Sequence, residues 1–111
     1  MSFRRRGRFR DLVERQLDLF AADEADLLGE AAAAEAAWNA APAQDAEEAY
    51  GDYQLVVDAI ADRLLDIRES YGATLEDGAA AEYAAEFTRV ATRRYRRYAT
   101  LLEDLDEPGL P

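Results

Sequence analysis

The stretch QDAEEAYGDYQLVVDAIADRLLDIRESYG, residues 44–72, decides the fold of this chain. Its apolar side chains recur at alternating spacings of four and three residues, the heptad pattern of a helix that packs against other helices along its length. The apolar seam consists of Ala46, Tyr50, Tyr53, Val57, Ile60, Leu64, Ile67 and Tyr71. The other side carries Glu48, Asp52, Asp58, Asp62, Asp66 and Glu69. This pattern predicts a long helix with one buried face and one acidic, solvated face.

Upstream of this stretch, a second long helix is predicted over 9–40. Its apolar stripe consists of Phe9, Val13, Leu17, Phe20, Leu27, Ala31, Ala34 and Trp38. Residues 39–44 then interrupt the periodicity, because Pro42 lacks an amide hydrogen and disfavours helix in the residue before it. A turn is therefore expected between the two helices.

Downstream, a third helix is predicted over 75–105. Its apolar stripe consists of Tyr83, Phe87, Val90, Ala91, Tyr98, Leu101 and Leu105. Gly72 is placed to end the preceding helix in the left-handed conformation that glycine adopts readily. Thr74, followed three residues later by Asp77, resembles a capping box at the start of the next helix. A turn at Asp77-Gly78 is the alternative, and it shifts the boundary by about four residues.

Short connections between long helices make the helices antiparallel neighbours. We therefore predict an all-α fold, an up-down-up bundle of three long antiparallel helices with coiled-coil-like packing, each about 45 Å long. The predicted parts are a basic N-terminal arm (1–8), the bundle (9–106, with helices over about 9–40, 44–72 and 75–105) and a frayed tail (107–111). Leu28, Leu55, Leu65 and Leu102 lie at the edges of their stripes. Such residues either widen the core or meet a second chain, so a monomer and a homodimer forming a larger bundle both stay open.

The composition excludes several classes of chemistry. The 111 residues include 24 acidic and 13 basic side chains, every basic residue is arginine, and neither cysteine nor histidine occurs. Without a thiolate, an imidazole base or a zinc ligand set of the usual types, we expect no enzyme, no metal and no cofactor. The chain also contains no apolar stretch of the roughly 20 residues that span a bilayer and no signal-peptide pattern, which predicts a cytoplasmic protein.

Two polar residues occupy positions where the helical pattern calls for apolar ones. Arg94 lies within the stripe of the third predicted helix, and Glu24 lies within that of the first. If the turns centre near Pro42 and Asp77, both residues fall in one layer of the bundle, whereas a turn at Gly72 places Arg94 level with Ala31. We predict an inward structural ion pair between Glu24 and Arg94; the alternative is that Arg94 extends to solvent over Tyr95 and Tyr98 while Glu24 lies at the rim. Gln16 and Arg68 form a second predicted inward pair.

Two clusters of arginine interrupt the acidic chain. The first precedes the first helix and consists of Arg4, Arg5, Arg6, Arg8 and Arg10, and the second includes Arg89, Arg93, Arg96 and Arg97 on the outward side of the third helix. Guanidinium groups suit phosphates, and arginines also pair with carboxylates on the same or a neighbouring subunit. These residues are therefore candidates for contact with an anion or with a partner.

These observations favour a non-enzymatic interaction module, a small adaptor or structural subunit that binds a protein partner or a copy of itself. The alternative is an accessory protein that binds nucleic acid or an anionic surface through its arginine-rich N-terminal arm. The net charge of −11 opposes the approach of polyanions at long range, which favours the first hypothesis.

Overall fold

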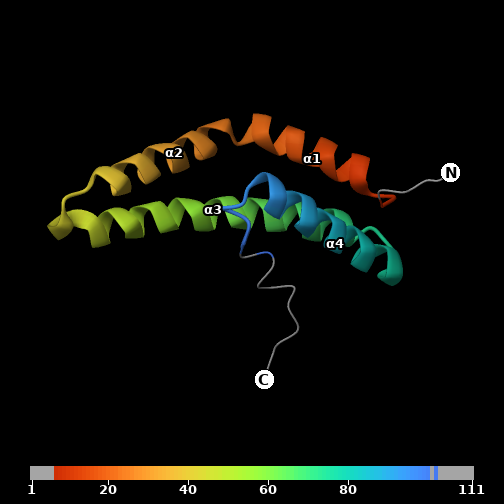
Figure 1. Cartoon of the computed structure of the whole chain (residues 1–111). Helices are drawn as coiled ribbons and strands as arrows, with labels where there is room; N and C mark the ends of the chain where they lie inside the picture. The colour runs from red at the N-terminus through yellow and green to blue at the C-terminus, as the bar shows by residue number, and fades with distance from the viewer. Residues whose placement is uncertain (1–6, 101, 103–111) are drawn as a thin grey trace, which may run out of the picture.

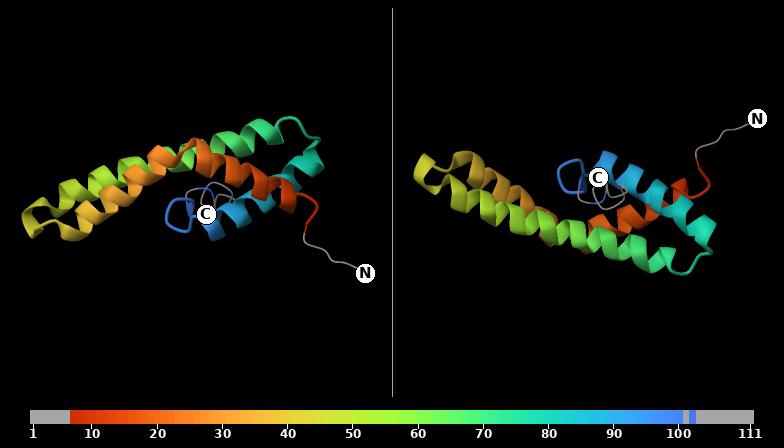
Figure 2. Two further views of the ribbon diagram at one scale, coloured as in Figure 1. Left: turned by 90° about the horizontal axis from the view of Figure 1, so that it is seen from above. Right: turned by 90° about the horizontal axis from the view of Figure 1, so that it is seen from below.

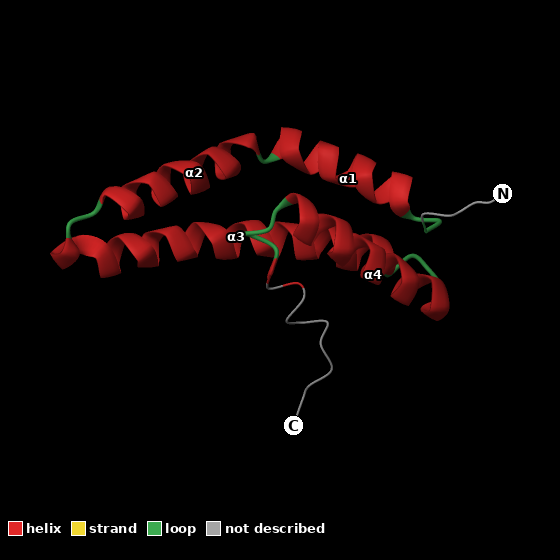
Figure 3. Cartoon of the chain, in the orientation of Figure 1, coloured by secondary structure: helices red, strands yellow, loops and turns green. Residues whose placement is uncertain are grey.

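The computed structural model describes residues 7–100 and 102, and its regular elements there are all helical, with no strand (Figure 3). The elements are α1 (Arg10–Asp23), α2 (Ala25–Ala40), the short 3-10 helix η1 (Ala43–Asp45), α3 (Ala46–Gly72) and α4 (Asp77–Arg94). α1 and α2 follow one another along one side of α3, and α4 returns beside the C-terminal part of α3 (Figure 1). The fold is all-α as predicted, but it has four α-helices in the described part of the chain and not three.

The predicted helix over 9–40 is divided at Glu24, whose backbone (φ −111°, ψ 29°) is not helical. The peptide hydrogen bonds on either side persist, because Glu24 N–H donates to the carbonyl of Phe20 (2.8 Å) and its own carbonyl accepts from Leu28 (2.9 Å). Asp23 and Asp26 flank the bend, and aspartate is a weak helix former that is favourable near a helix N-terminus. The bend lets the two halves follow different neighbours, since α1 packs on α4 and α2 packs on α3.

The long helix predicted over 44–72 is α3, which begins at Ala46, directly after η1, and ends at Gly72. Gly72 does not adopt the left-handed conformation, since Gly7 is the positive-φ glycine in the described residues and the chain after Gly72 continues through Ala73 at φ −65°. The expected cap is also absent: the hydroxyl of Thr74 donates to the carbonyl of Tyr71 (2.7 Å), and α4 starts at Asp77 without a side-chain cap. The prediction of how this turn closes was therefore wrong.

The third predicted helix, over 75–105, corresponds to α4, which ends at Arg94 and does not extend to residue 105. Four arginines in positions 93–97 crowd like charges, and cations are most favourable in the last turn of a helix. Beyond it, the Tyr95 ring packs edge-on against Phe20 at 5.5 Å between centroids, and Ala99 and Leu102 are buried. The predicted stripe members Leu101 and Leu105 lie outside the described residues. The same is true of residues 1–6 of the predicted basic N-terminal segment and of the predicted tail, 107–111.

The early end of α4 divides the molecule into two regions. With 18 residues against 27, α4 is about 27 Å long and α3 about 40 Å, so α4 covers only part of α3. We call α1, α4 and residues 60–72 of α3 the three-helix end, and residues 25–59 the arm. Figure 2 shows the arm projecting beyond α4 as a pair of helices.

The core lies mainly in the three-helix end. Its fully buried large side chains are Val13, Leu17, Ile60, Leu64, Tyr83 and Phe87, with Leu102 from the segment after α4. In the arm, α2 completely buries only Ala31, and the part of α3 that faces it buries Tyr53 and Val57. The heptad seam is thus buried at its centre, while Tyr50 near its start is 44% exposed.

Candidate functional site

The predicted pair of Glu24 and Arg94 does not form. Arg94 Nη2 donates to Asp18 Oδ1 at 2.7 Å, whereas Glu24 Oε2 lies 3.4 Å from Arg63 Nε. The hydrogen bond to Asp18 raises the pKa of Arg94 above its ordinary value. The prediction failed because it assumed one straight helix over 9–40 and a third helix of equal length. Arg94 and Glu24 instead form separate, partly exposed ion pairs along α1.

The second predicted pair also separates into two contacts. Gln16 Oε1 accepts a hydrogen bond from the hydroxyl of Tyr83 (2.8 Å), and Arg68 Nη1 donates to Thr88 Oγ1 (2.7 Å). Both inward positions were recognised from the sequence, but their partners on α4 were not, because Tyr83 and Thr88 show no unusual spacing. Burial raises the pKa of Tyr83 to about 12. These contacts tie α4 to α1 and to α3.

The N-terminal arginines that the structure describes pair within the chain. Arg8 Nε lies 3.2 Å from Glu82 on α4, and Arg10 Nε donates to Glu14 at 2.8 Å. Hydrogen bonding to Glu14 raises the pKa of Arg10. The other three members of this cluster, Arg4, Arg5 and Arg6, lie outside the described residues.

The arginines after residue 88 divide into two sets. Arg97 forms an ion pair with Glu35 on α2, and Arg89 forms one with Glu86 one turn earlier on α4. Arg93 and Arg96 join Arg89 around a surface hollow of about 370 Å³, which Thr92 and Thr100 also line. We call this the arginine hollow. The structure therefore brings Arg89, Arg93 and Arg96 together and separates Arg97 from them.

The carboxylate that holds Arg89 also packs on the start of the chain. The side chain of Glu86 is 5% exposed, and its Oε1 lies 2.6 Å from the place where a Cβ at Gly7 would be. Gly7 has φ +68°, the left-handed region that favours glycine. Glycine at this position therefore permits the close approach of Glu86.

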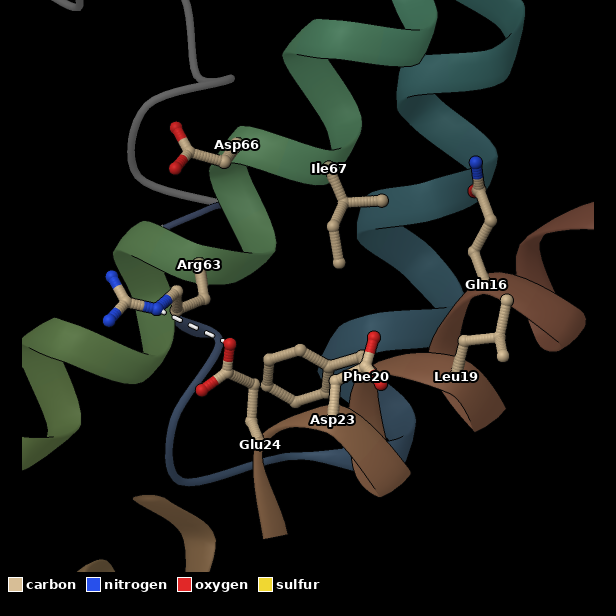
Figure 4. Close-up of a pocket in the computed structure, with 8 residues that line it drawn as sticks. All are labelled: Gln16, Leu19, Phe20, Asp23, Glu24, Arg63, Asp66 and Ile67. Atoms are coloured by element: carbon tan, nitrogen blue, oxygen red, sulfur yellow. Dashed lines mark ion pairs between the residues drawn. The ribbon is translucent and has the colours of Figure 1, made fainter. Parts of the chain in front are cut away.

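A groove of about 330 Å³ lies between α1 and α3 in the three-helix end (Figure 4). Phe20 and Ile67 meet across it, Leu19 is 61% exposed at its edge, and the Arg63–Glu24 ion pair stands beside Phe20. Gln16, Asp23 and Asp66 complete the lining. Within residues 7–100 and 102, no set of three or more acidic residues has an arrangement that could hold a metal ion. The groove is thus a partly apolar surface with acidic sides.

Three aromatic rings gather on the arm. Trp38 of α2 stacks on Tyr53 of α3 (centroids 5.4 Å apart, planes 25° apart) and packs at a tilt on Tyr50 (4.8 Å). Tyr53 is buried beneath them, while Trp38 is half-buried and Tyr50 is 44% exposed. In the sequence, Trp38 and Tyr50 belong to the apolar stripes of two different predicted helices. Reflecting position 38 through a turn centred at residue 44 would have brought them together.

The arm is also acidic throughout. It contains no basic residue, and its eight carboxylates are Asp26, Glu30, Glu35, Asp45, Glu47, Glu48, Asp52 and Asp58. Glu47 lies one helical turn before Tyr50, and Glu35 lies one turn before Trp38. The exposed aromatic pair therefore stands among carboxylates, although Glu35 is already paired with Arg97.

Comparison with protein-family models, with curated proteins and with solved structures finds no match to this chain. None of the helices, over the residues described, is both long and apolar enough to cross a membrane.

Proposed function

We propose that this protein is a non-enzymatic helical interaction module that binds a basic segment of a partner protein through the Trp38–Tyr50 pair on its arm. The observation that carries the proposal is this partly exposed aromatic pair on the part of the molecule where α2 packs on α3 alone. Tryptophan and tyrosine are the residues that most often dominate the free energy of protein–protein binding. The three-helix end supports the arm as a stable base.

The chemistry of the arm favours a cationic partner. Arginine and lysine side chains bind over the faces of tryptophan and tyrosine, and the neighbouring carboxylate of Glu47 is exposed and has no ion pair within residues 7–100 and 102. With eight acidic and no basic side chains, the arm attracts a basic segment from a distance and repels an acidic one. An arginine- or lysine-bearing helix or loop fits both features.

The same charge opposes a homodimer that joins two arms, because each copy brings eight carboxylates to the interface. We therefore expect a mass near that of the 12.4 kDa chain at low ionic strength. Light scattering at micromolar concentration tests this expectation. Stable dimers at low salt would contradict the assignment of the arm to a basic partner.

The proposal is tested by capture from a native lysate with four variants that form two matched pairs. Tyr50→Ser is compared with Leu19→Ser, which removes a side chain of similar exposure from the groove. Glu47→Arg is compared with Asp66→Arg, which reverses one exposed carboxylate on the same helix. We expect the captured proteins to be basic, and to be lost with Tyr50→Ser and Glu47→Arg but kept with both controls.

Trp38 is the single tryptophan of the chain, so its fluorescence reports binding at the arm directly. A recovered partner is expected to shift the emission of Trp38 in a saturable titration. Loss of capture with the two groove variants would assign docking to the groove and overturn the proposal. Capture that is unchanged in all four variants would also overturn the proposal.

A further inference from the structure

We infer that the arginine hollow on α4 binds a small multivalent oxyanion, of the kind presented by a diphosphate or triphosphate group. This site lies apart from the arm and does not depend on the function proposed for it. Arg89 and Arg93 are four residues apart on α4, so their side chains leave the helix on the same side, and Arg96 lines the hollow from the turn that follows α4. Two residues with hydroxyl groups, Thr92 and Thr100, complete the lining.

The charges of the chain make this hollow unusual. The protein has 24 carboxylate side chains for 13 arginines, yet neither Arg93 nor Arg96 has an acidic partner within 4.0 Å among the described residues. Their neighbours Arg94 and Arg97 both have one. Like charges held around one hollow repel one another, and an anion bound between them relieves that repulsion.

Arg89 contributes to the hollow although it is already paired. Its Nη2 atom contacts the carboxylate of Glu86, which is 5% exposed, and this contact fixes the direction of the guanidinium group. A guanidinium carries five N–H donors, so one contact leaves others for a ligand. Thr92 is committed within the helix, because its hydroxyl donates to the carbonyl of Thr88 at 2.6 Å. The ligand is therefore held chiefly by the three guanidinium groups.

Two features of the molecule disfavour an anion in the arginine hollow, and the negative charge of each can be compared with the positive charge of the arginines. The C-terminus of α4 carries about −0.5 of an elementary charge from the helix dipole, whereas the three arginines together with the Glu86 carboxylate that pairs with Arg89 carry a formal net charge of +2. The net charge of −11 acts over a longer distance and disfavours an extended polyanion more than a compact one. A hollow of about 370 Å³ likewise matches a small ligand better than a nucleic-acid duplex.

The test is a calorimetric titration of the full chain with inorganic tripolyphosphate. It is done in about 50 mM salt, where electrostatic attraction is weakly screened. Arg93→Gln and Arg96→Gln are each expected to weaken binding about tenfold, since each removes charge-assisted hydrogen bonds to the anion. Arg15→Gln is the matched control, because Arg15 is an exposed arginine on α1 that does not line the hollow. This control is expected to bind as the unaltered chain does.

Three results would overturn the inference. The first is the absence of saturable binding of tripolyphosphate. The second is an equal loss of affinity with Arg15→Gln, which would assign the binding to diffuse charge. The third is a longer polyanion, such as single-stranded DNA, binding more tightly per phosphate than tripolyphosphate and losing no affinity with Arg93→Gln. Circular dichroism of each variant confirms that the helices are intact, so that a loss of affinity reports on the hollow.

Discussion

The three-helix end and the arm come from the same kind of sequence but differ in how their helices are covered. In the three-helix end, Val13, Leu17, Tyr83 and Phe87 are fully excluded from solvent, whereas α2 in the arm completely buries one alanine. The arm depends on alanine, a good helix former, and on one aromatic cluster. The heptad seam of α3 therefore continues to direct packing beyond the end of α4, but part of its apolar surface there stays exposed.

The largest expected effect tests where the stability lies. Phe87→Ala removes a fully buried ring and is expected to lower the free energy of unfolding by about 4 kcal/mol. Trp38→Ala removes a larger but half-buried ring from the arm and is expected to cost about 1 to 2 kcal/mol. Urea unfolding followed by far-ultraviolet circular dichroism measures both. Equal losses would show that the arm carries as much of the stability as the three-helix end.

A smaller effect concerns the contact between α1 and α4. Tyr83→Phe removes the hydrogen bond to Gln16 and is expected to cost about 1 kcal/mol near pH 8. The pKa of Tyr83 is raised to about 12 by burial, above the value of about 10 in an unfolded chain. The neutral hydroxyl therefore stabilises the fold fully below about pH 10, and this contribution is lost as the pH rises from about 10 to 12.

The urea midpoint of the unaltered chain is accordingly expected to fall between about pH 10 and pH 12. Tyr83→Phe should show a smaller fall over the same interval, because phenylalanine does not ionise. Tyr50→Phe, in the arm and 44% exposed, is the control and should keep the full fall. An identical pH dependence in all three proteins would contradict the assignment to Tyr83.

The smallest expected effect separates the ion pairs along α1. A double-mutant cycle between Asp18 and Arg94 should give a coupling free energy below about 1 kcal/mol, because both side chains are partly exposed. A cycle between Glu24 and Arg94 should give none, since Glu24 pairs with Arg63. Coupling between Glu24 and Arg94 of the size found for buried pairs would restore the arrangement predicted from the sequence and would contradict the bend at Glu24.

The features that the sequence could predict are those set by local pattern. The helix over 44–72 follows from its seam, and α3 starts within two residues of the predicted position and ends at Gly72. The bend at Glu24 was missed because no proline or glycine marks it, and it arises from the different neighbours of α1 and α2. The end of α4 at Arg94 was missed because the apolar spacing continues to Tyr98.

The candidate sites were predictable only in part for the same reason. The arginines after residue 88 were recognised as candidates, but the sequence alone did not distinguish Arg93 and Arg96 from Arg97, because that depends on which carboxylates lie within reach. The Trp38–Tyr50 pair depends on the register of the hairpin, which is set by the turn at Pro42 and η1. The contacts between helices therefore could be identified only from the tertiary structure, whereas most of the helices could be predicted from the sequence.

The close approach of Gly7 and Glu86 constrains how this sequence can vary. A side chain at position 7 would meet both an unfavourable φ of +68° and the carboxylate of Glu86, which is enclosed and has little room to move. A smaller residue at position 86 would relieve the clash, but it would also remove the carboxylate that holds Arg89. Positions 7, 86 and 89 therefore cannot change independently, and a variant of this protein that alters the first of them is expected to alter the other two.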